Sequence, residues 1–311
     1  MNRFIKTIIL FSIPFIIWIT LVYFVDPFNF YGVNEAKPEH SSKYDISYQI
    51  NNRLFKLIQF SKCDKHNIII GDSRAHALKE DEILKITGVQ IKNMALGGSH
   101  FGEMKEVFWH LVKNYKISEV YFGISFFNLC AIGDDGSRIK EAERIAKNPI
   151  SYSFNVHVYR ALKSYFSYLV TGKKMQLGKF KESKEEVWKR QLSLADYVFS
   201  RHLIYTNYQG DIDSIASYCA DNNIKLVFFV PPTHTDLQEK INNAGLASEN
   251  EQFLHYLSKY ILYDFNYPNY MTTQIDNFKD PYHFTDEVGK IIIKELFHNE
   301  NFGLSKRNHA K

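Results

Sequence analysis

Cysteine, glycine and proline are all scarce in this chain of 311 residues, which has 3 cysteines, 15 glycines and 8 prolines. An odd and sparse set of cysteines (Cys63, Cys130 and Cys219) excludes a disulfide framework. Neither a CxxC pair nor a cysteine–histidine spacing typical of zinc is present. His76 and His100 have no ligand partners at a useful spacing, so no metal and no other cofactor is predicted.

An excess of one charge is also lacking. The formal net charge is +4 and the charged residues are spread along the chain, so no basic face indicates a nucleic-acid partner. Internal repeats and low-complexity tracts are absent from the sequence. Apolar residues make up 45% of the chain, which suffices for a sizeable core. The length suits one large domain, or one domain with appendages.

One long apolar run stands near the N-terminus. Ile8 to Val25 carries no charge, Arg3 and Lys6 precede it, and Asp26 follows it. This length reaches the threshold for a membrane-spanning helix. Positive charge before the run places residues 1–7 in the cytoplasm and everything after the anchor outside. The prediction is a single-pass membrane protein with an extracytoplasmic C-terminal domain.

Two alternatives compete with a membrane anchor as the interpretation of this apolar run. A cleaved signal peptide has a similar charged start and apolar stretch, but no small-x-small cleavage site follows, and residues 23–27 are bulky. A buried core helix would seldom be apolar on all sides at the extreme terminus. An uncleaved anchor is therefore favoured, and chemistry that uses cytoplasmic ATP or a nicotinamide is disfavoured.

Strand and helix patterns alternate at short spacing along much of the chain. Because short alternation favours parallel strands joined by helical crossovers, we expect an α/β fold with a doubly wound, mostly parallel sheet. The expected strands are 67–70, 89–94, 119–124, 224–230 and 261–265, and the expected helices are 75–84, 102–114, 211–222, 249–260 and 286–297.

Three segments interrupt this rhythm. Residues 26–65 are expected to form a linker and a helix on the rim of the domain. Residues 133–210 are charged and aromatic, and are predicted to be a helical insertion over the carboxyl edge of the sheet, or else a surface elaboration with no role at the site. Residues 301–311 are predicted to be a disordered basic tail.

The segment on which the functional prediction depends is Ile68 to Ala75. A β-branched apolar run ends at Gly71, and Asp72 and Ser73 follow where a strand hands over to a helix. Backbone N–H groups are unpaired at a helix start, so Ser73 is a candidate nucleophile beside part of an oxyanion hole. The alternative is that Asp72 or Ser73 only caps the helix.

A second segment stands before the last helix and reads Asp280-Pro281-Tyr282-His283. An aspartate behind a histidine can hold the imidazole tautomer while the histidine takes a proton from a serine. Loops at the carboxyl ends of parallel strands converge on one crevice, so Ser73, His283 and Asp280 can meet there. The alternatives are a turn aspartate before Pro281 and a surface histidine.

Taken together, these segments resemble the SGNH/GDSL hydrolase superfamily. Gly71-Asp72-Ser73 matches its first block, and Asp280 to His283 matches its last. Asn93 to Gly98 resembles the second block, and Gly123 to Asn128 resembles the third block loosely, since Ser125 stands where the superfamily usually has asparagine. The resemblance implies an oxyanion hole built from Ser73, Gly97, Gly98 and either Asn128 or Ser125.

The resemblance also implies a fold and an activity. It implies a flavodoxin-like, three-layer α/β domain over residues 66–300, after one transmembrane helix. The anchor, the Asp26-Pro27 exit and Pro231-Pro232 resemble the branch that modifies cell-surface polymers, such as the O-acetylation proteins of alginate-type exopolysaccharides and the D-alanyl transfer protein of teichoic acids.

The predicted function is an extracytoplasmic serine acyltransferase or acylesterase that acts on O-acyl groups of cell-surface or exported polysaccharide. The implied partners are that polysaccharide or an acyl ester, the membrane, and a membrane-bound acyl-donor protein. The alternative is a non-catalytic carbohydrate-binding or assembly component with the same fold. Ser73, Asp280 and His283 favour an enzyme, whereas the imperfect third block favours the binding component.

Two further residues stand close to the predicted site. Arg74 follows Ser73 and is expected to form a salt bridge on the helix surface, or else to steer an anionic polymer. His234 follows the end of a strand, where it either lines the crevice or is a solvated loop histidine, and the solvated loop is favoured.

Overall fold

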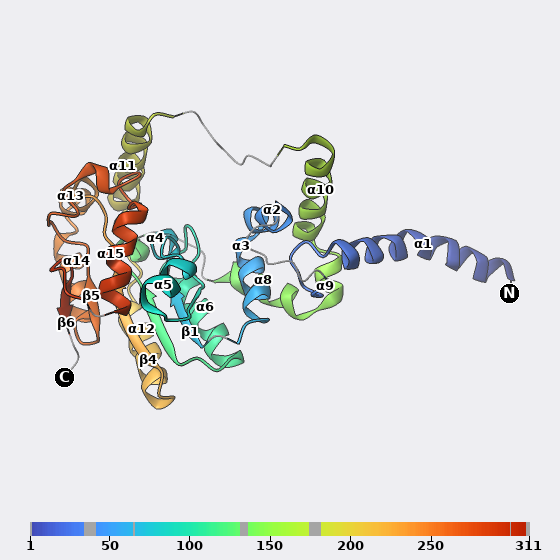
Figure 1. The fold of residues 1–311 in the computed structure, drawn as a ribbon, viewed down its shortest axis with the longest axis horizontal. Coiled ribbons are helices and arrows are strands. Elements are labelled where there is room, and N and C mark those ends of the chain that lie inside the picture. Colours follow the sequence, from blue (N-terminus) through green and yellow to red (C-terminus); the bar gives the residue numbers. More distant parts are fainter. Residues whose placement is uncertain are drawn as a thin grey trace. The chain divides into compact units, whose positions relative to one another are not determined.

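A sheet with helices packed on it and a separate, smaller helical unit make up the chain (Figure 1). The computed structural model describes residues 2–33, 42–64, 66–130, 136–173, 182–298 and 300–308. Met1–Cys63 and Arg138–Phe180 form the helical unit, and Asp64–Ser137 and Lys181–Lys311 form the sheet unit.

The sheet contains six strands within the described ranges, in the order β2-β1-β3-β4-β5-β6. The first five pair in parallel, and β6 pairs with β5 in the antiparallel direction. The strands are β1 (Asn67–Ile70), β2 (Lys92–Asn93), β3 (Glu119–Gly123), β4 (Lys225–Val230), β5 (Leu262–Asp264) and β6 (Lys306–Asn308). This confirms the expected mixed α/β fold with a mostly parallel sheet.

Helices cover both faces of the sheet, which explains why its strands are apolar at consecutive positions. Ile69 of β1 is in register with Tyr121 of β3, and both belong to a core shared with α5 (Glu80–Thr87) and α15 (Asp286–Phe297). The next residue of β3, Phe122, faces the other way and contacts Phe101 of α6 (Phe101–Asn114). The helix α12 (Tyr208–Asp221) contacts β4.

Shorter helices follow the carboxyl ends of the strands. These are α4 (Ser73–His76), α7 (Phe127–Cys130), α13 (Thr235–Asn243) and a 3₁₀ turn, η2 (Ile275–Asn277). Two longer helices, α11 (Lys184–Ser200) and α14 (Ala247–Leu257), complete the sheet unit.

The helical unit joins the N-terminal part of the chain to the first half of the predicted insertion. Its helices are α1 (Asn2–Val25), α2 (Ser42–Ile50), α3 (Asn52–Phe60), α8 (Ser137–Lys147), α9 (Pro149–Ser153) and α10 (Val156–Thr171). The helix α10 packs on α2, and both α9 and α10 contact α1.

The buried carboxylate of Asp26 organises the end of α1. It accepts hydrogen bonds from the backbone N–H groups of Phe30, Tyr31 and Gly32 at 2.7, 2.9 and 3.0 Å. The hydroxyl of Tyr152 in α9 also donates to it at 3.0 Å. Burial raises the pKa of Asp26, although these donors act in the opposite direction. The carboxylate therefore links the chain that leaves α1 to α9.

The helix α1 is long and apolar enough to span a membrane over Arg3–Val25, and only 6% of its most apolar window is buried in the protein. Pro14 lies inside it. A helix that is apolar on all sides and projects from the rest of the chain is typical of a membrane anchor or a signal sequence.

Three predicted domain boundaries need correction. Residues 26–65 contain two helices, α2 and α3, and these belong to the helical unit and not to the rim of the sheet unit. The predicted insertion, 133–210, is divided: its first half belongs to the helical unit and its second half to the sheet unit, where Trp188 of α11 joins the core. Within the predicted disordered tail, 306–308 form β6, because β5 offers an open edge for pairing, and 309–311 lie outside the described residues.

Two glycines allow the strand ends to approach closely, and they provide a stability test. A Cβ on Gly71 would lie 2.5 Å from Ala75 Cβ and 2.9 Å from Gly123 O, and a Cβ on Gly123 would lie 2.6 Å from Phe229 Cζ. We expect Gly71→Ala and Gly123→Ala each to lower the free energy of unfolding by about 1–3 kcal/mol through overpacking.

Thermal and urea unfolding of the full chain in detergent micelles would measure this loss. Gly97→Ala is the matched control, because nothing lies within 4 Å of the Cβ it would add. Equal stability of all three variants would contradict the close approach of β1 and β3 at this point.

Candidate active site

Ser73 lies at the first position of α4, directly after the turn that ends β1. The side chain of Asp72 caps this helix by accepting a hydrogen bond from the Arg74 N–H at 2.9 Å. The carbonyl of Gly71 accepts hydrogen bonds from Leu96 N and Ser99 Oγ, at 2.9 and 3.0 Å. Asp72 is therefore the cap, and the Ser73 hydroxyl is left for another partner.

That partner is His283. Its Nε2 lies 2.8 Å from Ser73 Oγ, across 210 positions of the sequence. Its Nδ1 lies 2.9 and 2.8 Å from Oδ1 and Oδ2 of Asp280. The structure thus brings the three predicted residues into one hydrogen-bonded chain, in the order Ser73, His283, Asp280.

Asp280 is held in its ionised form. Burial alone would raise its pKa, but hydrogen bonds from the His283 ring and from the backbone N–H groups of Tyr282 and His283 lower the pKa below its ordinary value. A carboxylate in this position fixes the histidine with a proton on Nδ1 and an open lone pair on Nε2. The imidazole is therefore oriented to accept the proton of the Ser73 hydroxyl.

The loop that carries Asp280 and His283 is braced from several directions. Lys279 N donates to His283 O at 2.7 Å, which closes the loop on itself. His234 N donates to Pro281 O at 3.0 Å, so the segment after β4 supports the loop from outside. Phe278 and Phe284 pair as an isolated bridge at its base. The geometry of the histidine thus depends on packing around the loop.

His234 is not the solvated loop histidine that the sequence favoured. Its side chain is buried, and its Nδ1 accepts a hydrogen bond from Asp236 N at 3.1 Å as the cap of α13. Its ring packs edge-on against Trp188, with centroids 4.9 Å apart. It supports the loop of Asp280 and His283 through its backbone, and its ring packs against Trp188 and Phe278.

Gly97 and Gly98 lie in the turn after β2, and this turn is attached to the turn before Ser73 through the contacts of Leu96 and Ser99 with Gly71. Gly98 has a φ of 69°, which glycine adopts without strain. Within the described ranges, neither glycine N–H donates to another backbone group outside regular secondary structure. Both N–H groups therefore remain candidates for binding an oxyanion.

The prediction that Asn128 donates its side chain to an oxyanion is wrong for this structure. The Asn128 amide is buried, and its two N–H bonds are directed at Asp72 Oδ2 (2.9 Å) and at Ser99 O (3.3 Å). Its Oδ1 accepts a hydrogen bond from Ser125 N at 2.9 Å. Because an amide has only two donor hydrogens, none remains for a substrate.

Arg74 also differs from the prediction, since it is not on the helix surface. Its side chain is 2% exposed and its guanidinium forms a fork with the Asp72 carboxylate. It also donates to Ser125 Oγ at 2.7 Å and to Asn128 Oδ1 at 3.2 Å. A buried ion pair with these two acceptors therefore connects the turn after β1 to the segment after β3.

The pair is charged in spite of its burial. Burial alone would raise the pKa of Asp72, but the charge and hydrogen bonds of Arg74, with that of Asn128, lower the pKa below its ordinary value. A carboxylate on its own in such a place would be very unfavourable. Neither the burial of Arg74 nor its partners can be read from the Gly-Asp-Ser-Arg segment, because both depend on where β3 ends.

Tyr282 was also not singled out by the sequence. Its ring packs against Phe127, with centroids 5.0 Å apart, and its hydroxyl is buried with no hydrogen-bond partner among the described residues. Burial raises the pKa of this phenol well above its ordinary value, so the hydroxyl stays neutral. The sequence signal that could have identified Tyr282 is its position between Asp280 and His283.

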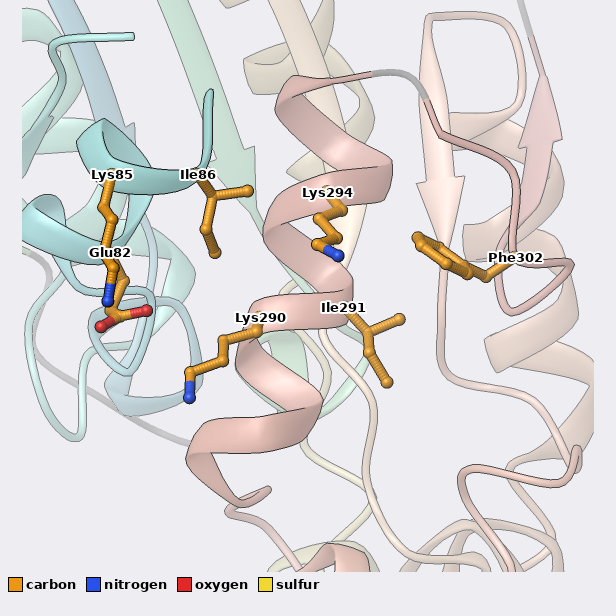
Figure 2. A pocket seen from close by; sticks show the side chains of 7 residues that line it. All are labelled: Glu82, Lys85, Ile86, Lys290, Ile291, Lys294 and Phe302. Carbon is orange, nitrogen blue, oxygen red and sulfur yellow. The ribbon is translucent and has the colours of Figure 1, made fainter. Parts of the chain in front are cut away.

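Other features of the sheet unit lie apart from these residues. Within the described ranges, no group of three or more histidine, cysteine or acidic side chains is arranged to hold a metal. An open pocket of about 320 Å³ lies between α5 and α15 (Figure 2), and its lining includes Lys85, Lys290, Lys294 and Phe302 but none of Ser73, Asp280 and His283.

The chain is similar to solved structures but matches no family model and no curated protein. Among solved structures, it is similar to one from Bacteroides fragilis described as a "putative acylhydrolase", with 14% identity, a TM-score of 0.41, and coverage of 78% of this chain and 91% of that one. It is also similar to a GDSL-like lipase from Bacteroides thetaiotaomicron, with 13% identity, a TM-score of 0.42, and coverage of 80% and 98%.

The buried pair of Asp72 and Arg74 leads to a stability prediction. Arg74→Ala leaves the Asp72 carboxylate buried without its counter-charge, so we expect the free energy of unfolding to fall by about 3–5 kcal/mol. Lys79→Ala is the matched control, because Lys79 and Asp286 form an exposed pair whose loss is expected to cost about 0–1 kcal/mol.

Urea unfolding of the full chain in detergent, followed by tryptophan fluorescence, would compare the two variants. Similar small losses for both would show that Arg74 does not neutralise a buried charge in solution.

Proposed function

We propose that this chain is a membrane-anchored serine acyl enzyme that acts outside the membrane on O-acyl groups of cell-surface or exported polysaccharide. The observation that carries the proposal is the hydrogen-bonded chain from Ser73 Oγ through His283 to Asp280, with distances of 2.8 Å at both ends of the imidazole. Such a chain activates a hydroxyl as a nucleophile.

The proposed reaction has two halves that use the same residues. Ser73 Oγ attacks the carbonyl carbon of an ester while His283 Nε2 takes the hydroxyl proton, and Asp280 stabilises the imidazolium. Collapse of the tetrahedral intermediate breaks the ester bond, and His283 gives its proton to the leaving alkoxide. Water or a sugar hydroxyl then loses a proton to His283 and attacks the acyl-serine, which frees Ser73.

The oxyanion formed in each half needs hydrogen-bond donors. Ser73 N–H is the first in its helix and has no acceptor inside that helix, and the N–H groups of Gly97 and Gly98 lie in the attached turn. We assign the oxyanion to these backbone groups, without Asn128. One such donor is typically worth about 3 kcal/mol in the transition state, so the rate of an enzyme with fewer donors is lower but still substantial.

Membership of the SGNH/GDSL superfamily is part of this proposal. The order of the parallel strands, β2-β1-β3-β4-β5, is that of flavodoxin-like sheets, and this supports a flavodoxin-like, three-layer domain. In such sheets the site lies where the strand order reverses, here between β1 and β3. Ser73 follows β1, and the segment that holds Arg74 follows β3.

The proposed location follows from the N-terminal helix, and the proposed substrate follows from the resemblance to the branch that modifies cell-surface polymers. Arg3 and Lys6 before the apolar segment favour a cytoplasmic N-terminus and an extracytoplasmic site. A polysaccharide at the cell surface is then the accessible acceptor, and an acyl group from the cytoplasm has to be delivered by a separate membrane protein. Transfer to a sugar hydroxyl is favoured over hydrolysis because the enzyme is held at the membrane.

A non-catalytic carbohydrate-binding or assembly component is the second candidate. One observation favours it: the third-block side chains, Ser125 and Asn128, are committed to Arg74 and Asp72 and are not open to a substrate. A binding protein would keep the fold but would not form an acyl-serine.

Labelling with a fluorophosphonate separates the two candidates. We expect the full chain in detergent to be labelled at Ser73, and Ser73→Ala to abolish the labelling, because the probe reacts only with an activated hydroxyl. Asp280→Asn is expected to slow labelling by roughly 10³–10⁴-fold through loss of the correct tautomer. Ser214→Ala, at an exposed serine of α12, is the control, and an unlabelled Ser73 in folded protein would support the binding component.

The choice between transfer and hydrolysis needs its own measurement. With p-nitrophenyl acetate as donor, we expect an oligosaccharide acceptor to gain acetyl groups, because a sugar hydroxyl competes with water for the acyl-serine. Acetylated oligosaccharide would be quantified by mass spectrometry, with Ser73→Ala as the blank. Release of free acetate alone, at a rate that the acceptor does not change, would indicate an esterase.

A further inference from the structure

An apolar corner of the helical unit is left uncovered in the structure. The α9–α10 corner, residues 149–159, exposes Ile150, Phe154, Val156 and Tyr159, with exposed fractions of 71, 51, 50 and 51%. Four large apolar side chains are exposed within ten successive positions. An exposed apolar patch in a protein marks a surface that lipid or a binding partner covers.

This corner lies beside α1 at a depth inside the apolar segment. Phe154 contacts Phe15, with ring centroids 6.3 Å apart, and Tyr159 contacts Trp18 at 6.1 Å. The indole N–H of Trp18 donates to Ser153 O at 2.7 Å. At a rise of about 1.5 Å per residue, Phe15 and Trp18 lie roughly 15 and 10 Å before the end of α1 at Val25.

The corner is also fixed in this place by buried contacts. Tyr152 stacks on Phe30 with centroids 4.4 Å apart, and its hydroxyl reaches the Asp26 carboxylate. The hydroxyls of Tyr31 and Ser153 are 2.9 Å apart. Asp26, Phe30 and Tyr31 belong to the segment that follows α1. The α9–α10 corner therefore cannot move away from the end of α1 without breaking these contacts.

We infer that the α9–α10 corner is inserted in the lipid bilayer beside α1, as a second point of membrane attachment. The inference rests on the proposed anchoring by α1. A bilayer that surrounds α1 at Phe15 and Trp18 also reaches the side chains that touch them. The occupant of the corner is therefore the lipid of the same membrane, at the depth of Phe15 and Trp18.

The charges around the corner fit this occupant. Exposed basic side chains follow the apolar patch in α10, at Arg160 and Lys163. Lysine and arginine at such positions extend to the headgroup phosphates and are attracted by anionic lipids.

The pattern along α10 points the same way. Its exposed apolar residues at 156, 159, 166 and 170 lie with Lys163 on one stripe of the helix, and Leu169 is exposed beside that stripe. The opposite stripe, with Ala161 and Leu162, is buried, and α10 packs on α2. A helix with one stripe in the protein and another uncovered apolar stripe beside a membrane anchor is typical of an interfacial helix.

Site-specific depth measurements test this inference on the full chain in nanodiscs that contain anionic phospholipid. The free cysteines Cys63, Cys130 and Cys219 are first replaced by serine or alanine, and single cysteines are then placed at Ile150, Phe154, Ile9 and Gln49 and labelled with NBD. Ile9 lies within α1 and reports the anchor. Gln49 is exposed on α2 of the same unit and is the matched control.

We expect NBD at 150 and 154 to show blue-shifted emission and to be quenched by lipids that carry a nitroxide on the acyl chain. NBD at 9 is expected to be quenched by lipids as well, and NBD at 49 to keep its emission in water. A lipid-quenched label at 9 with water-like emission at 150 and 154 would overturn the inference and leave the anchor intact.

Two other results would also overturn it. Blue-shifted emission at 150 and 154 without quenching by any nitroxide lipid would show that a protein, either a second copy or another partner, covers the corner. An unquenched label at 9 would show that α1 does not span the bilayer, so the proposed anchoring and this inference would fail together. None of these outcomes depends on the acyl chemistry at Ser73.

Discussion

The buried ion pair between Asp72 and Arg74 is the constraint on which the candidate site depends. The pair holds the turn after β1 in place, because Arg74 also donates hydrogen bonds to Ser125 and Asn128 after β3. Asn128 in turn donates a hydrogen bond to Ser99 after β2. Three strand ends are thereby held to one another by charge-assisted hydrogen bonds in a site that excludes water, where such bonds are strong and a missing partner is costly. Ser73 stands on top of this assembly, so the position of its hydroxyl is set before any substrate binds.

His283 reaches Ser73 from an independent direction. Its loop is closed by its own backbone and is supported by the segment after β4, through His234 and Pro281. Ser73 and His283 thus lie on separate segments, which are joined by the hydrogen bond between Ser73 Oγ and His283 Nε2 and by the packing of Tyr282 on Phe127. Asn128 completes the network around Arg74, and its side-chain donors are directed at Asp72 and Ser99.

At the other end of the chain, Asp26 plays a similar organising part in the helical unit. Its buried carboxylate gathers the segment after α1 and the hydroxyl of Tyr152, and so holds the α9–α10 corner against α1. Both units therefore use one buried carboxylate with a full set of donors to fix a turn of the chain. In the sheet unit the turn presents a hydroxyl, and in the helical unit it presents an apolar corner that we assign to the membrane.

The sequence by itself determined the local elements and the residue types of the site. Periodicity placed the sheet strands and most helices within a few residues, the apolar run gave α1, and Gly71 to Ser73 and Asp280 to His283 gave the three residues that meet. It did not give the roles of Arg74, Asn128 and His234, the division of residues 133–210 between two units, or the strand at 306–308. These features depend on which side chains from distant segments are buried together. Burial decides whether an arginine forms an ion pair at the surface or neutralises a carboxylate in the protein interior. Only the tertiary structure sets that, because the cost of burying a charge is met by partners that lie up to 56 positions away in the sequence.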